Sequence, residues 1–137
     1  MIEQERDGLR LVMQHIHRVQ VNMAMFMTQL AFRSAAHDQT KFHKEELPLV
    51  VGKAAMDKLE YMSEEERALV ASVETAVKHH YDFNSHHPEH YENGVAGMTL
   101  LDVVEMFCDW KAASDASPGG GLLNSIEKSK ERFDLDP

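Results

Sequence analysis

The chain has 137 residues, of which 43% are hydrophobic and 27% are charged, and its formal net charge is −9. These proportions are typical of one globular domain. The acidic balance argues against a nucleic-acid polymer as a partner, because no basic stripe would neutralise its phosphates. The only cysteine, Cys108, excludes a disulfide framework and a cysteine-based zinc site.

Neither a signal peptide nor a membrane span is expected. Charged residues at positions 3, 5, 6 and 7 interrupt any apolar run at the start of the chain. The densest apolar stretch, residues 23–32, is shorter than the roughly 20 residues that a membrane-spanning helix needs. We therefore expect a cytoplasmic protein with no membrane partner.

The first predicted helix begins near Leu9. Four apolar residues then recur at steps of three and four, which is helical spacing: Val12, Ile16, Val19 and Met23. His15 lies at the edge of this apolar face. Residues 25–32 are apolar almost all round, which predicts a central buried helix.

Further helices are predicted after Pro48, because the residue before a proline is disfavoured in the helical conformation. Residues 50–61 form a weaker candidate helix. A capping box over residues 63–66 opens the next helix. On that helix His80 lies on the apolar, inward face, whereas His79 is rotated from it by about 100°. The spacing therefore favours His80 over His79 as an inward-facing residue.

Two more helices are predicted in the last third of the chain. Residues 84–97 are rich in Asn, Ser, Pro and Gly, which predicts a loop. An N-cap at Thr99 opens a helix through about Ala113, and a last amphipathic helix spans residues 122–133. The sequence thus predicts an all-α single domain, residues 1–137, with five to six helices and no strand.

The strongest chemical signal is the run His37-Asp38-Gln39-Thr40-Lys41. An imidazole beside a carboxylate suits a divalent transition metal, and the nearby ammonium of Lys41 suits an anionic substrate group. The chain has nine histidines, and six of them lie between His79 and His90 or beside Asp38. Each such residue alone has an ordinary structural reading. Together they predict a metal site with these candidate ligands: His15, His37, Asp38, His80, His86, His87 and Asp109.

For two of these candidate ligands, Asp109 and His15, residue spacing alone does not decide whether the side chain reaches the metal site. Asp109 shares one helix face with Asp102 and Glu105, and this acidic stripe is either a metal-facing wall or a solvent-facing surface. His15 would lie about 33 Å from His37 on a straight helix. Both can bind one ion only if the chain turns back, and the expected turn is near residues 27–28.

Three segments resemble the motifs of the HD-domain metal-dependent phosphohydrolase superfamily. They are His15-Ile16-His17-Arg18-Val19, the run from His37 to Lys41, and Asp109-Trp110-Lys111-Ala112-Ala113. His80, His86 and His87 are similar to the extra histidines of its two-metal branches. Residues 84–91 together with residues 105–110 are also similar to a small family of phage and bacterial proteins, a likeness that implies no activity.

The resemblance to the HD superfamily implies an HD-like helical fold and a metal-dependent phosphohydrolase. Its substrate would be a small phosphate ester, with a nucleotide as the favoured class, attacked by a metal-activated water. His37, Asp38 and Asp109, completed by His15, would hold one divalent Mn, Co, Ni, Zn or Fe ion, and His80 with His86 or His87 a second. Asp38 and Lys41 are the expected catalytic residues, and Lys41, Arg18 and Asn84 are the expected substrate-binding residues.

Two other functions use the same residues. A few members of the superfamily hold two irons and oxidise small molecules with O₂, and open coordination positions would suit that chemistry equally. Alternatively, the chain is a non-catalytic helical binding module, whose histidines hold a structural metal or none. A homodimer is compatible with so small a helical domain. Asn84 and Tyr81 have a further reading, as groups that orient the ligand histidines.

Overall fold

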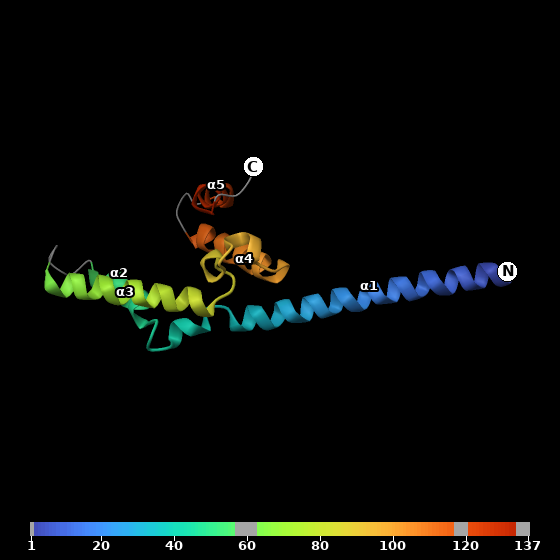
Figure 1. Cartoon of the computed structure of the whole chain (residues 1–137), viewed down its shortest axis with the longest axis horizontal. Helices are drawn as coiled ribbons and strands as arrows, with labels where there is room; N and C mark the ends of the chain where they lie inside the picture. Colours follow the sequence, from blue (N-terminus) through green and yellow to red (C-terminus); the bar gives the residue numbers. More distant parts are fainter. Residues whose placement is uncertain (1, 57–62, 117–120, 134–137) are drawn as a thin grey trace. The chain divides into compact units, whose positions relative to one another are not determined.

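The computed structural model describes residues 2–56, 63–116 and 121–133. These residues form five α-helices and three short 3₁₀ helices, without a strand among them (Figure 1). The elements in chain order are α1 (Glu3–Ala36), η1 (Gln39–Phe42), α2 (Leu47–Met56), α3 (Glu64–Phe83), η2 (Pro88–His90), η3 (Gly94–Gly97), α4 (Leu100–Ala116) and α5 (Leu122–Phe133). The all-α prediction is confirmed. None of the described helices is both long and apolar enough to cross a membrane.

The chain divides into two units, Met1–Ala35 and Ala36–Pro137, which we describe separately. The first unit is the helix α1. This helix continues through Met27 and Thr28 without a break, so the predicted turn is wrong. The reason is local: neither Gly nor Pro is present there, and the hydroxyl of Thr28 donates to the carbonyl oxygen of Ala24, one turn back in the same helix.

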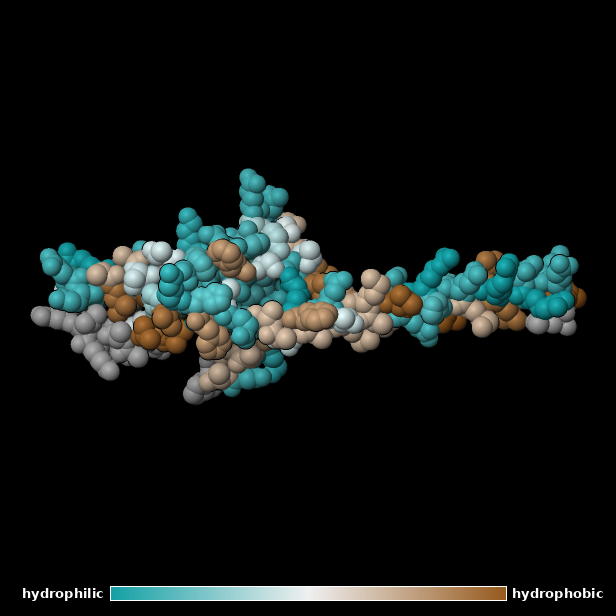
Figure 2. Space-filling view, turned by 90° about the horizontal axis from the view of Figure 1, so that it is seen from below, coloured by the Kyte–Doolittle hydropathy of each residue, from teal (hydrophilic) through white to brown (hydrophobic). Residues whose placement is uncertain are grey.

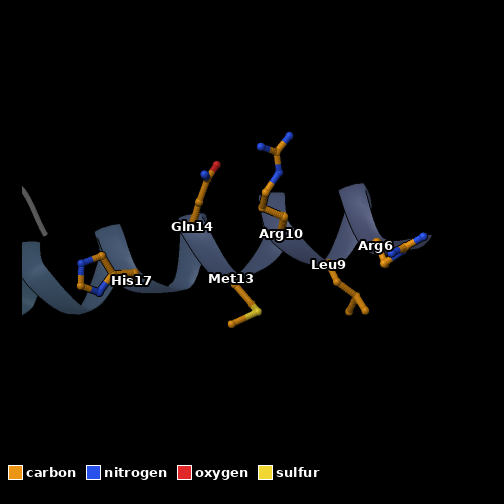
Figure 3. A pocket seen from close by; sticks show the side chains of 6 residues that line it. All are labelled: Arg6, Leu9, Arg10, Met13, Gln14 and His17. Atoms are coloured by element: carbon orange, nitrogen blue, oxygen red, sulfur yellow. The ribbon is translucent and has the colours of Figure 1, made fainter. Parts of the chain in front are cut away.

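The prediction of a central buried helix over residues 25–32 is also wrong. No residue of α1 is buried; the side chains of Met27 and Phe32 are 63% and 74% exposed. A single helix has no second element within its unit to cover its apolar residues, which lie along α1 among polar ones (Figure 2). A shallow hollow on α1 has six lining residues: Arg6, Leu9, Arg10, Met13, Gln14 and His17. All six come from one helix, and Arg10 and Met13 point in opposite directions (Figure 3), so the hollow is not a closed cavity.

The second unit begins with a helix pair, α2 and α3, that pack against each other. Ser63 caps α3, since its hydroxyl accepts a hydrogen bond from the backbone nitrogen of Glu66, which confirms the predicted capping box. Pro48 lies in the first turn of α2, where its missing N–H is not needed. The weaker helix predicted over residues 50–61 is present as far as Met56, and residues 57–61 lie outside the described residues.

A buried glycine, Gly52, sets the distance between α2 and α3. A Cβ atom at this position would come within 2.9 Å of Cγ2 of Val73 on α3. Valine is branched at Cβ and restricted in its χ1 angle, so Val73 cannot easily move aside. The absence of a side chain at Gly52 therefore permits the close approach of the two helices.

The loop between α3 and α4 is anchored on one buried carboxylate, that of Asp102, which is 1% exposed. Its Oδ1 accepts from the hydroxyl of Ser85, and its Oδ2 accepts from the hydroxyl of Tyr91 and from the backbone nitrogen of Thr99. Thr99 accepts in return from the backbone nitrogen of Asp102, so the predicted N-cap is present. Burial alone would raise the pKa of Asp102, but the hydrogen bonds from Ser85, Thr99 and Tyr91 hold it well below its usual value.

Gly52→Ala should lower the free energy of unfolding by about 1–3 kcal/mol, because the added methyl group forces α2 and α3 apart. Urea denaturation measures the effect. Gly8→Ala on α1 is the matched control: a Cβ there meets no atom within 4 Å, and alanine is the better helix former. An equal loss in both variants would contradict a role for Gly52 in helix packing.

Asp102→Asn should lower the free energy of unfolding by about 2–4 kcal/mol at pH 7, because an amide cannot accept all the hydrogen bonds that the carboxylate accepts. The folded pKa of Asp102 is depressed relative to an unfolded value of about 3.9, so its stabilisation is complete above pH ~4 and declines as the pH falls further. The difference in the free energy of unfolding between the parent and Asp102→Asn should therefore become smaller below pH ~4. Asp115→Asn, at an exposed residue of the same helix, should change little at any pH.

Candidate metal centre

The second unit brings together six of the seven predicted ligands from four parts of the chain. His37 and Asp38 lie between α1 and η1, and His80 lies in the last turn of α3. His86 and His87 come from the loop before η2, and Asp109 comes from α4. Asp38 has a positive φ of 56°, the only such value among the described residues other than glycine. Aspartate tolerates this left-handed conformation better than most residues do.

One group of potential ligands contains Asp38, His80, His86 and His87. Their ligand atoms all lie within 4.8 Å of one another. Asp38 Oδ1 is 3.3 Å from His80 Nε2 and 3.6 Å from His86 Nε2, and the Nε2 atoms of His80 and His87 are 3.0 Å apart. Sequence left open which of His86 and His87 faces the site, and the structure places both there.

A second group contains His37, Asp38 and Asp109, again with ligand atoms within 4.8 Å of one another. His37 Nε2 is 3.5 Å from Asp38 Oδ2 and 3.7 Å from Asp109 Oδ1. Asp38 belongs to both groups and turns a different oxygen toward each. This arrangement suits a carboxylate that bridges two cations.

Two carboxylates that the sequence analysis did not name as ligands or partners hold the histidines from behind, one of them buried and the other partly exposed. Glu46, 0% exposed, is 2.8 Å from Nδ1 of both His79 and His80. Glu105 Oε1 is 2.9 Å from His37 Nδ1 and 3.2 Å from His86 Nδ1, and these three residues form a third group of possible ligands. Glu105 was visible as part of the acidic stripe on α4. Glu46 belongs to no sequence pattern that would indicate its position behind the histidines.

The carboxylates determine which ring nitrogens carry hydrogen. Burial alone would raise the pKa of Glu46, but hydrogen bonds from His79, His80 and Thr40 lower it, so Glu46 is ionised and can only accept. The histidine nitrogens that face it must therefore donate, and Nδ1 of His37 faces the carboxylate of Glu105 in the same way, at 2.9 Å. In rings that carry one hydrogen, the Nε2 atoms on the opposite side then present lone pairs toward Asp38 and Asp109, and Nε2 of His80 also contacts Nε2 of His87.

Burial keeps the loop histidines neutral. It lowers the pKa of His87 to about 3, with further lowering by His86 and His80, and it also lowers the pKa of His86. Two buried atoms in this region have no hydrogen-bond partner, Asp38 Oδ1 and His86 Nε2. Unsatisfied buried polar atoms are rare in folded proteins, and two neighbouring acceptors of this kind fit a bound cation.

Lys41 and Asn84 are both present beside the cluster, in different roles. Nζ of Lys41 donates to Oδ2 of Asp38. Burial alone would raise the pKa of Asp38, but the hydrogen bond and charge of Lys41 lower it. Asn84 is buried behind His80, and its amide nitrogen lies 2.8 Å from Thr40 Oγ1 and from the carbonyl oxygen of His80. These contacts favour the orienting role of Asn84 over the substrate-binding one.

The remaining predicted residues are placed as follows. The acidic stripe on α4 divides: Glu105 and Asp109 face the histidines, whereas Asp102 is buried in the loop anchor. His80 is buried and His79 is half-buried, as the helix spacing predicts. His15 and Arg18 lie on α1, in the first unit, and their assignments stay predictions. The turn on which the assignment of His15 depended is absent.

Comparison with known proteins gives a family and no activity. Nothing among curated proteins or solved structures matches the chain. The sequence profile of one family, described as a family of unknown function (DUF5662), matches residues 4–136. Because this match covers nearly the whole sequence, the chain belongs to the family DUF5662.

Proposed function

We propose that the protein is a metal-dependent phosphohydrolase that acts on a small phosphate ester, with a nucleotide as the favoured substrate class. One observation carries the proposal. Histidine Nε2 atoms, oriented by Glu46 and Glu105, converge on the two oxygens of Asp38, and two buried acceptors in this cluster have no partner. The resemblance of residues 37–41 and 109–113 to HD-domain motifs supports the same conclusion.

The donor set fits one or two transition-metal ions. Asp38, His80, His86 and His87 would hold one ion, and His37, Asp38 and Asp109 the other. Imidazole nitrogens outnumber carboxylates in the first group, which favours Mn, Fe, Co, Ni or Zn over Mg²⁺ or Ca²⁺. When bound, such ions supply a water of lowered pKa as the nucleophile and neutralise charge on phosphoryl oxygens.

Charge explains why an anionic substrate would need the ions. Asp38, Asp109, Glu46 and Glu105 carry four negative charges, and Lys41 adds one positive charge, which leaves about −3 at neutral pH. A phosphate ester would be repelled by this charge. Two divalent ions would reverse it to about +1. Lys41, which is partly exposed, would then contact the phosphate while it holds Asp38 in place.

The diiron oxygenase remains a second candidate, because the nitrogen-rich ligand set suits iron as well as it suits zinc or cobalt. The identity of the metal separates the two functions.

Elemental analysis of protein purified without a His-tag or a chelator should find near-stoichiometric transition metal. Iron would direct assays to O₂ consumption, and manganese, cobalt, nickel or zinc would direct them to nucleotides.

Metal should stabilise the folded protein. Adding Zn²⁺ or Mn²⁺ at 100 times its dissociation constant to chelator-treated protein should raise Tm by about 10 °C, because binding contributes about 2.7 kcal/mol. Asp38→Asn alters the carboxylate shared by both groups and should remove most of this rise. His43→Ala, at an exposed histidine outside both groups, should keep it. Equal rises in all three proteins would contradict the proposed site.

The metal-loaded protein should release inorganic phosphate from at least one compound in a panel of nucleotides. Lys41→Met should reduce kcat/KM by about tenfold or more, because the ammonium near the phosphate is lost while the metal ligands remain. Metal content, measured in parallel, should stay near that of the parent. Full metal occupancy without phosphate release from any nucleotide would reject the nucleotide phosphohydrolase, and O₂ consumption by the iron form would favour the oxygenase.

A further inference from the structure

We propose that Glu46 is a positioning residue that sets the tautomer of His80 and thereby controls the candidate metal group of Asp38, His80, His86 and His87. The inference rests on the proposed metal function. Glu46 belongs to none of the ligand groups, yet its carboxylate is fully buried, directly behind His80. A buried charge is expensive unless hydrogen bonds satisfy it, so its position there calls for an explanation.

Each oxygen of Glu46 has its own donors. Oε1 accepts from His79 Nδ1 at 2.8 Å. Oε2 accepts from His80 Nδ1 at 2.8 Å and from the Thr40 hydroxyl at 3.0 Å. The donors come from η1 and from the last turn of α3, and Glu46 itself directly precedes α2. Glu46 therefore joins three elements at the back of the histidine cluster.

The directions of the hydrogen bonds on the Nδ1 side of His80 follow from Asn84. Its amide nitrogen carries two hydrogens, and it lies 2.8 Å from Thr40 Oγ1 and 2.8 Å from the carbonyl oxygen of His80. The opposite orientation of the amide would place its oxygen against that carbonyl oxygen, so the nitrogen must donate. Thr40 accepts from Asn84, which leaves its own hydroxyl hydrogen for Glu46.

This directed chain leaves one assignment for His80. The amide nitrogen of Asn84 is also 3.1 Å from His80 Nδ1, but both of its hydrogens are already used. The hydrogen between His80 and Glu46 must therefore be carried by Nδ1. In a ring that carries this one hydrogen, Nε2 presents a lone pair toward Asp38 Oδ1, 3.3 Å away, and toward His87 Nε2, 3.0 Å away. In the other tautomer an N–H would point there and prevent ligation.

Glu46 and Glu105 act on different parts of the centre. Glu46 contacts His80, which belongs only to the group with His86 and His87. Glu105 contacts His37 and His86, one from each group. Loss of Glu46 should therefore weaken the ion bound by His80 and spare the ion bound by His37, Asp38 and Asp109.

A glutamine at position 46 removes the negative charge of Glu46 but keeps an oxygen that can accept a hydrogen bond from His80. Its single oxygen should occupy the position of Oε2, because two donors, His80 and Thr40, point there. Its NH₂ group would then face His79, whose ring changes tautomer instead. Glu46→Gln should thus keep the ligating tautomer of His80, whereas Glu46→Leu removes the acceptor altogether.

The experiment combines two measurements on the full chain. Two-dimensional ¹H–¹⁵N NMR of the metal-free protein reports the tautomer of each histidine, and titration with Zn²⁺ reports the number of ions bound and their dissociation constants. The parent and Glu46→Gln should both show Nδ1–H at His80 and bind two ions. Glu46→Leu should show a mixture of tautomers and weaken one ion by about 10–100-fold. Glu45→Gln, at the exposed neighbouring residue, should match the parent.

Two outcomes would overturn the inference: Nε2–H at His80 in the parent, or an unchanged tautomer and unchanged binding of both ions in Glu46→Leu. Should that variant not fold, the double variant Glu46→Gln/Thr40→Val replaces it. Without the Thr40 donor the glutamine can turn its NH₂ group to His80, so the same mixture of tautomers is expected. A parent that binds no Zn²⁺ would reject the proposed function, while its NMR spectrum would still test the tautomer.

Discussion

The arrangement of the candidate centre depends on contacts between histidine Nδ1 atoms and two carboxylates, the buried one of Glu46 and the partly exposed one of Glu105. Glu46 and Glu105 are acceptors, so the rings of His80, His37 and His86 must turn their N–H groups away from the interior of the cluster. Their lone pairs then face Asp38, itself an acceptor. Acceptors that face acceptors are unfavourable without a proton or a cation between them, and burial depresses the pKa of His86, so protonation of its ring is not the favoured remedy.

The helices of the second unit keep these carboxylates in place. Glu46 directly precedes α2, and α2 can approach α3, which carries His80, because Gly52 has no side chain. Glu105 lies on α4, one turn beyond Asp102, the residue that anchors the loop bearing His86. The packing of the helix pair and the loop anchor therefore determine whether donors and acceptors meet at the distances that the centre requires.

Sequence predicted most of the residues that the structure brings together here, because the candidate ligands are of unusual type and spacing. The His37-Asp38 pair is rare in ordinary surfaces, and helical phase alone distinguishes His80 from His79. Glu46 was not predictable, because the charged run in which it lies is typical of a solvated segment and its burial depends on long-range contact with α3. The prediction of a turn in α1 was wrong for a related reason. The local sequence contains no residue that ends a helix, and the turn was expected only because His15 was assumed to bind the same ion as His37.

A non-catalytic helical module that binds no metal explains these observations least well. Such a module could carry histidines on its surface, but it would have no need to bury a carboxylate oxygen and an imidazole nitrogen without partners. Each such atom costs about 1–3 kcal/mol, a large fraction of the stability of a small domain. A bound cation would offset that cost and would leave coordination positions for a substrate. The proposed hydrolase and the alternative oxygenase would both use this feature, so the identity of the metal, rather than the fold around it, would decide between them.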